Sequence, residues 1–401
     1  MKKKYKIACL ALICLIGMDV YSQNNPELDK LIEAALSNNK ELISYQLQTD
    51  ASQANINTAF DFEKTSVYYG YDENNVAPND EALRVFGVEQ TFSFPTVYGA
   101  RRKVYKSQWE QHKALYEIQK NKLVLDISLI YEQIVYIQNK EKLYTQLDSL
   151  YADFSNAGSR KFELGESNYL EKITAEAKFK QIHTHLVQLK NQKHAFYEQL
   201  KSLIQGGEEY WIRNDELVLL HLNDTNAGKE LQKQYLETVS KTHLSQVKFQ
   251  NQNWLPDLSI ELFTGTNKGL GYRQNGFQIG IAIPLLFSGN VAKNKTTELE
   301  RKSWEAMRSN REIQIESYYL QKQAELNQHR EMIKYYTENG QLLSKEIIKT
   351  ADAGYKNGEI DFFQYIQSME NAISIEMDYL DNILSYNKSY LELHHFNFNE
   401  Q

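Results

Sequence analysis

Two short stretches of the chain alternate apolar and polar residues, and the second repeats the first. Every second residue from Phe86 to Phe94 is apolar except Gln90, and the residues between them are glycine or polar. From Gly276 to Ile283, Phe and Ile alternate with small or polar residues. A period of two residues predicts a β-strand with one apolar and one polar face. Each pattern is followed by a proline, which has no N–H to continue a ladder.

Another alternating stretch precedes each of these strands, so the chain predicts two β-hairpins. The first spans 65–94 and turns through a segment rich in Asn, Asp and Pro. The second spans 257–284 and turns through glycines and asparagines at 265–272. Together they give four amphipathic strands. Their predicted apolar faces include Phe92, Phe94, Phe277, Ile279, Ile281 and Ile283.

A long helical pattern without proline follows each hairpin. From Thr96 to about Phe162, apolar residues recur at alternating steps of four and three, which is typical of a coiled-coil seam. A helix of that length would extend roughly 100 Å. A second long helix is predicted from Asn290 to about Tyr355. Both end at glycine-containing turns, near 165 and 358, after which a shorter helix returns.

The order of elements indicates an internal duplication. The turn from Phe162 to Glu166 is echoed from Tyr355 to Glu359, and the prolines after the two strands stand at nearly the same separation. We expect a first repeat at 25–205 and a second at 229–401, the latter with the C-terminal tail. Each repeat is helix, hairpin, long helix, tight turn and helix. The segment 206–228 between them is a small mixed insert.

Residues 1–22 are typical of a secretory signal peptide. Four lysines precede an apolar run, Ile7 to Met18, that is short for a membrane span, and small residues follow at a cleavage position. The alternative is a buried N-terminal helix. Both cysteines, Cys9 and Cys14, lie in this segment, so the processed chain would have no thiol, disulfide or thiolate metal site.

Composition narrows the class of protein. Charged residues make up 24% of the chain and the mean hydropathy is −0.59, which argues against a compact helical membrane protein. The net charge of −7 argues against nucleic acid as a partner, because phosphate binding requires clustered Lys and Arg. The 27 tyrosines suit membrane interfaces, although they also suit ordinary cores.

The predicted strands have the length and the two-sided pattern of an outer-membrane barrel, with lipid outside and water inside. Four strands cannot close a barrel, and an open edge in lipid leaves backbone groups unpaired at several kcal/mol each. Copies of the chain must therefore complete the ring, and three copies would supply twelve strands. The alternative for the strands is one face of a soluble sandwich.

This ordered set of features resembles the TolC-like outer membrane efflux protein family. The resemblance covers Asn25 to His395. It rests on the duplication, on F-S-F-P-x-x-x-G at Phe92–Gly99, on I-A-I-P-L-L-F-S-G at Ile281–Gly289 and on L-P-D-L-S at Leu255–Ser259. The aromatic-x-x-G turns ending at 165 and 358 complete the set.

The resemblance implies a fold that is mainly α with a pair of membrane β-hairpins. It implies a homotrimer with a twelve-stranded β-barrel in the outer membrane of a Gram-negative bacterium and a helical barrel in the periplasm. Such a protein is a passive exit duct that meets a periplasmic adaptor and an inner-membrane pump. No catalytic group, cofactor or metal is expected, and the insert at 206–228 corresponds to the family's equatorial domain.

In that family the two glycine-containing turns form the periplasmic tip that meets the adaptor. Glycine allows two long helices to reverse tightly and leaves backbone exposed to a partner. The alternative is a plain helix turn without a partner. The residues assigned to the tip are Phe162, Leu164, Gly165, Glu166, Tyr355, Asn357, Gly358 and Glu359.

The family also carries acidic residues just beyond the second turn, at the pore entrance. The corresponding positions here are Glu171, Gln364 and Gln367, of which only Glu171 is acidic. Three copies of Glu171 could form an anionic ring that favours cations, or the residue could lie on a solvated helix face. The sequence therefore departs from the family pattern at this point.

Two other classes of function compete with the duct. A periplasmic or surface coiled-coil interaction protein without channel activity would use the same long helices but would not need the alternating hairpins. A secreted enzyme would have to use the insert, which has no paired acid and base and no nucleophile. His183 and His185 are two residues apart on a helix and diverge, so they do not share a metal. The cargo is not specified by the sequence.

Overall fold

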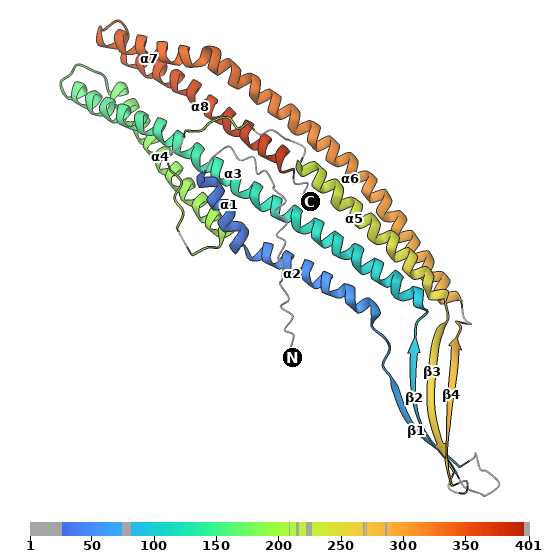
Figure 1. The fold of residues 1–401 in the computed structure, drawn as a ribbon. Helices are drawn as coiled ribbons and strands as arrows, with labels where there is room; N and C mark the ends of the chain where they lie inside the picture. Colours follow the sequence, from blue (N-terminus) through green and yellow to red (C-terminus); the bar gives the residue numbers. More distant parts are fainter. Residues whose placement is uncertain are drawn as a thin grey trace, which may run out of the picture.

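The computed structural model describes residues 26–396 except 74–81, 208, 214–215, 222–226, 268, 270 and 285–286. The predicted signal peptide, the tip of the first hairpin and the last residues of the tail lie outside these residues. Long helices run from a four-stranded sheet at one end of the molecule to two helix turns at the other (Figure 1). The predicted fold class, mainly α with four antiparallel strands, is confirmed.

The first repeat begins with two helices instead of the single helix predicted before the first hairpin. These are α1, Pro26–Asn38, and α2, Lys40–Asn55, which a 3-10 turn, Ile56–Phe60, extends. Asn39 separates them because its side chain caps α2, accepting from the Leu42 N–H at 2.9 Å, and donates to the Leu203 carbonyl at 2.8 Å. The strands β1, Ser66–Asp72, and β2, Leu83–Phe92, follow.

A single uninterrupted helix, α3, runs for 69 residues from Pro95 to Glu163. Pro95 is suited to this start because the first helical N–H has no partner in any case. The returning helix α4, Tyr169–Ile204, is capped by Asn168, whose side chain accepts from the Glu171 N–H at 2.9 Å. Phe94 was predicted to belong to the strand, but it lies at the junction between β2 and α3.

The second repeat has the same order of elements with two local differences: it begins with one helix instead of two, and a turn interrupts its long helix. It consists of α5, Ala227–Gln250, with a 3-10 turn, Asn251–Trp254; β3, Asp257–Thr266; β4, Arg273–Ala282; α6, Ser288–Tyr335; α7, Gln341–Lys356; and α8, Phe362–His394. A π-helical turn, Tyr336–Gly340, joins α6 to α7. Ile283 follows β4, so this strand is also shorter than predicted.

The two hairpins form one antiparallel sheet in the order β1-β2-β3-β4. The sequence predicted two hairpins but not the ladder between them, in which Val88 lies opposite Leu262 and Glu89 opposite Glu261. In the helical part, α3 lies between α2 and α5 near the sheet and between α4 and α8 farther away. One lateral side of the helical layer is therefore formed by α2 and α4, and the opposite side by α6 and α7 (Figure 1).

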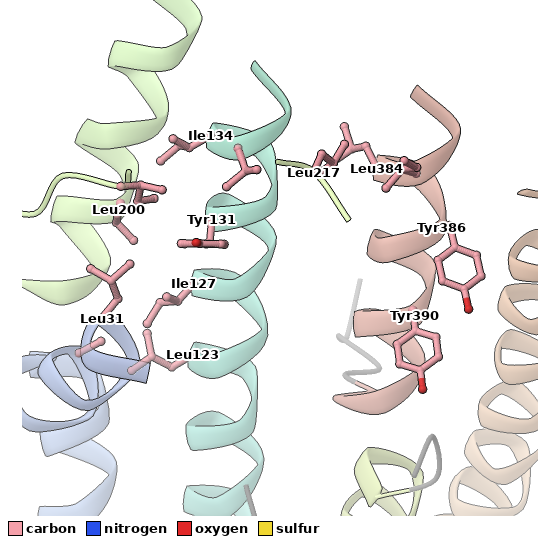
Figure 2. Close-up of a cluster of buried hydrophobic side chains, with 14 of the residues drawn as sticks. Leu31, Leu123, Ile127, Tyr131, Ile134, Leu200, Leu217, Leu384, Tyr386 and Tyr390 are labelled. Atoms are coloured by element: carbon pink, nitrogen blue, oxygen red, sulfur yellow. The ribbon is translucent and has the colours of Figure 1, made fainter. Parts of the chain in front are cut away.

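The largest core lies half-way along the helices, where the insert joins them. Leu31, Ile127, Ile134 and Leu200 bring α1, α3 and α4 together, and Leu217 of the insert reaches Leu384 of α8 (Figure 2). A second cluster near the helix turns joins Tyr151 and Phe154 of α3 to α7 and α8. Long helices with narrow apolar stripes depend on such lateral packing. Of the helices in the described part of the chain, none is long and apolar enough to cross a bilayer.

Candidate functional site

The sheet has an apolar and a polar face, because residues paired across an antiparallel ladder point to the same side. Val88, Leu262 and Phe277 lie opposite one another across β2, β3 and β4, and Ile279 pairs with Ile260 in the next row. The neighbouring row on the other face is Ser66, Glu89, Glu261 and Gln278. The register therefore matches the alternation seen in the sequence.

The apolar face is uncovered in the single chain. Exposed fractions are 73% for Phe277, 67% for Ile279, 62% for Ile281 and 62% for Ile283. Soluble monomers rarely expose a contiguous apolar patch of this kind, so this face requires an apolar environment. Phe92 is an exception among the predicted residues, because its ring packs edge-on against Phe62 at a centroid distance of 5.7 Å.

The polar face carries hydrogen-bonding groups and small residues. The Tyr68 ring lies over Gly87, where a Cβ would be 2.3 Å from the ring, and its hydroxyl donates to Glu261 on β3. Gly276 similarly lies beneath the Phe263 ring. The glycines on this face leave room for large side chains of the neighbouring strands.

Both sides of the chain are open. Within the described residues, β1 pairs only with β2 and β4 only with β3, so each has an unpaired edge. The helices on the same two sides also expose apolar side chains. On α2 and α4 these include Leu47 (62% exposed) and Val187; on α6 and α7 they include Ile313, Leu320 and Leu342. Long unpaired edges are ready to accept a further strand.

The two helix turns have matching backbones. Gly165 and Gly358 adopt φ values of 75° and 73°, in the left-handed region that favours glycine. After each, a glutamate N–H closes the turn: Glu166 donates to the Lys161 carbonyl and Glu359 to the Gly354 carbonyl, both at 2.8 Å. This pattern of bonds is a Schellman motif.

The predicted tip residues differ in exposure. Leu164 is 73% exposed, and Asn357, Glu166 and Glu359 are also exposed. Tyr355 instead packs inward, with its ring stacked on Tyr365 at 4.8 Å and against Phe154 at 5.9 Å. Exposed apolar side chains from the start of α4 adjoin the first turn, which extends its apolar surface; they are Tyr169, Leu170 and Ile173.

Two of the three predicted entrance residues act in helix capping. Glu171 accepts from the Ser167 hydroxyl at 2.6 Å and from the Asn168 amide at 3.2 Å. Gln364 completes a capping box with Asp361: each side chain accepts from the other residue's backbone N–H, at 3.0 and 2.8 Å. Gln367 is exposed. The local contacts give Glu171 and Gln364 structural roles beside any role in a pore.

Long-range contacts near the tip were not predicted from the sequence. Glu370 on α8 accepts from the Tyr151 hydroxyl of α3 and from the Lys178 ammonium of α4, both at 2.9 Å. The Tyr365 hydroxyl donates to Asp352 at 2.6 Å. Burial raises the pKa of Tyr151, and the adjacent Glu370 carboxylate raises it further. No local sequence pattern signals the contacts of Glu370, because Tyr151 and Lys178 belong to the other repeat.

A buried polar cluster fastens the insert to the helices. The Asn387 amide, 0% exposed, donates to Glu132 and to the Val218 carbonyl, both at 2.8 Å, and its oxygen accepts from the Leu220 N–H at 3.0 Å. Burial raises the pKa of the Glu132 carboxyl to about 7, although the hydrogen bond from Asn387 opposes this shift. No local sequence pattern indicates this cluster either.

Metal binding finds no support in the residues that the structure describes. No group of three or more His, Cys, Asp or Glu side chains there could hold a metal ion. The histidine pair considered above includes His183, which contacts Asp148 across the α3–α4 packing at 3.2 Å. The features that stand out are surfaces: one apolar sheet face, two open sides and an exposed tip.

Solved structures share this arrangement over most of the chain. A membrane protein from Pseudomonas aeruginosa matches with a TM-score of 0.78 at 15% identity, over 92% of this chain and 93% of that one. The outer-membrane channel OprN matches with 0.79 at 12% identity, over 92% and 89%. The Campylobacter jejuni CmeC outer membrane channel matches with 0.70 at 15% identity, over 92% and 85%.

The chain has the fold of these outer-membrane channels. The fold expected from the resemblance to the TolC-like family is thereby confirmed. No protein-family model matches the chain. No curated protein sequence matches it either. The channel fold is thus recognised through the arrangement of its elements, at sequence identities too low to carry residue roles from one protein to another.

Proposed function

We propose that this protein is a TolC-like outer-membrane duct, in which three copies enclose a passive path from the periplasm to the exterior. One observation carries the proposal: an uncovered apolar sheet face lies between two unpaired strand edges. Contact of the apolar face with lipid lowers the free energy, whereas unpaired strand edges in lipid raise it until they pair with another strand. Identical copies pairing β1 with β4 satisfy both conditions, and the channel fold of the solved structures supports this assembly.

The helical part continues the same ring into the aqueous compartment. Its exposed tip residues, Leu164 among them, provide the surface for a periplasmic adaptor, which connects the duct to an inner-membrane pump. The pump supplies the energy, so the duct itself needs no catalytic group. Outer-membrane location follows from the strands, because a strand barrel with these polar interior residues suits that membrane.

The sheet face is tested by placing a charge on it. Ile279→Arg with Ile281→Arg should lower the fraction of protein inserted into the membrane and abolish conductance in planar bilayers, because each arginine on a lipid face costs about 2–4 kcal/mol at the membrane midplane. Gln278→Arg, on the opposite face of the same strand, is the matched control and should still insert.

The alternative, a coiled-coil interaction protein without channel activity, makes the opposite prediction. Its membrane partitioning would be unaffected by arginines on the apolar face, and purified protein would not conduct. A single folded copy that stays soluble without detergent would also contradict the duct.

A further inference from the structure

The helices that leave the sheet, α3 and α6, carry cations from about one turn after their first residue, ahead of any acidic residue. Neither α3 nor α6 has an acidic residue in its first turn, whereas α1, α2, α4 and α5 each have at least one. The first acidic residue of α3 is Glu110, and that of α6 is Glu298. These cations lie beyond the first turn, where the effect of the helix dipole has fallen off, so the dipole does not account for them.

The cations are accessible. Arg102, Lys103 and Lys106 on α3 and Lys293 and Lys295 on α6 are all exposed. They have no carboxylate within ion-pair distance among the residues that the structure describes, in contrast to Arg301 about two turns farther along α6, which pairs with Glu298. The acidic residues near the starts of β1 and β3 number three, against five cations; they are Asp61, Glu63 and Asp257.

The three cations of α3 lie on the face that we assign to the outside of the ring. A groove of about 670 Å³ has α3 as its floor and α2 and α5 as its walls, with Gln108, Gln111 and His112 contributed by α3. Because α3 is recessed between α2 and α5, the groove opens on the concave side of this layer of helices, which we assign to the inside of the ring. At 3.6 residues per turn, Arg102, Lys103 and Lys106 point away from that groove.

Aromatic residues lie where the strands meet the long helices, just before these cations. Phe62, 52% exposed, contacts Tyr98 at a centroid distance of 5.2 Å, and Trp254 stacks on Phe287 at 5.7 Å. Aromatic side chains of this kind gather where hydrocarbon meets headgroups. The cations follow within about 10–16 Å along α3 from Pro95. Helical side chains lean toward the helix N-terminus, here toward the sheet, and long cationic side chains extend readily to the interface.

We propose that these exposed cations bind the phosphate groups of anionic phospholipids in the leaflet that faces the periplasm. This basic collar consists of Arg102, Lys103 and Lys106 of α3. The proposal rests on the proposed function, because it requires the sheet to lie in a membrane. Three copies of the chain would place these cations at three positions around the ring, and α6 adds Lys293 and Lys295, which point to different sides of its helix.

The test compares lipid binding by the full-length protein in neutral detergent. Wild type should bind phosphatidylglycerol in preference to phosphatidylcholine, measured by lipid retention in native mass spectrometry and by thermal stabilisation. R102Q/K103Q/K106Q should lose about tenfold or more of this preference, since each cation near an anionic surface contributes about 1 kcal/mol. The matched control, K334Q/K345Q/K349Q, removes three exposed charges from α6 and α7 and should keep it.

Other outcomes overturn the collar. It is wrong if the collar variant keeps the wild-type lipid preference, or if inorganic phosphate alone at millimolar concentration reproduces the stabilisation. A changed ion selectivity of the variant in bilayers would place the cations in the lumen and would also contradict it. Wild-type conductance with no lipid preference refutes the collar but not the duct, whereas absence of conductance in wild type refutes the duct.

Discussion

At the scale of single residues, burial matters most where it changes the charge state of a group. Glu132 of α3 is 7% exposed and lies where α3 meets α8 and the insert. Asn387 donates a hydrogen bond to its carboxylate. A carboxyl in this position is easier to bury when protonated. The insert is therefore held most firmly when Glu132 is neutral.

The pH dependence of stability follows with a definite sign. The pKa of Glu132 rises from 4.5 in the unfolded chain to about 7 in the fold, so the folded state disfavours the charged form. Wild type should lose stability as the pH rises from about 4.5 through 7, by about 3 kcal/mol from this group. Glu132→Gln removes the titration and should show a progressively higher thermal midpoint than wild type between pH 5 and pH 8.

Glu359→Gln removes an exposed carboxylate at the tip and is the control. Its thermal midpoint should differ from that of wild type by the same amount at both pH values. A pH-independent difference between wild type and Glu132→Gln would show that Glu132 does not titrate in this range.

At the scale of elements, local patterns were predictable and pairings between distant elements were not. The alternation in the strands and the four-three spacing of the long helix report directly which side chains share a face, and the observed register agrees. The ladder between β2 and β3 joins the two repeats, and nothing local signals it. The break at Asn39 depends on the Leu203 carbonyl, which lies 164 residues away.

The candidate site residues also divide into those with a local sequence signal and those without one. The glycine turns were recognisable because a left-handed backbone strongly favours one residue type. The entrance positions were assigned only by resemblance, and the structure shows that Gln364 caps α8. The π-helical turn at Tyr336–Gly340 had no signal, because it depends on Tyr336 stacking on Tyr379 of α8 at 3.7 Å.

The capping box makes a prediction about the start of α8. Asp361→Ala removes the acceptor for the Gln364 N–H and should destabilise the first turn of α8 by about 1 kcal/mol. Hydrogen exchange of the Gln364 and Tyr365 amides, which donate to Asp361, should become roughly fivefold faster, by the same free energy. Asp361→Asn keeps an acceptor in place and should exchange nearly as wild type does. Equal exchange in wild type and the alanine variant would show that the cap is not needed.

At the scale of the whole molecule, the two open sides should meet in neighbouring copies. The side with β1, α2 and α4 differs from the side with β4, α6 and α7, so the contact is head-to-tail and forms a closed ring only if the rotation between copies closes. Ile313 and Leu320, seven residues apart on α6, are 66% and 55% exposed and provide an apolar stripe for such a contact.

Charging this stripe separates assembly from membrane affinity. Ile313→Glu with Leu320→Glu should shift the particle mass in detergent from three chains toward one, because two carboxylates would be buried without partners in the contact. The variant should still need detergent, since its apolar sheet face is unchanged. Gln314→Glu lies about 100° around the same helix from Ile313 and should assemble as wild type does. If the stripe variant kept its full mass, α6 would face the lumen or solvent instead of a neighbouring copy, and the ring would have to close through other surfaces.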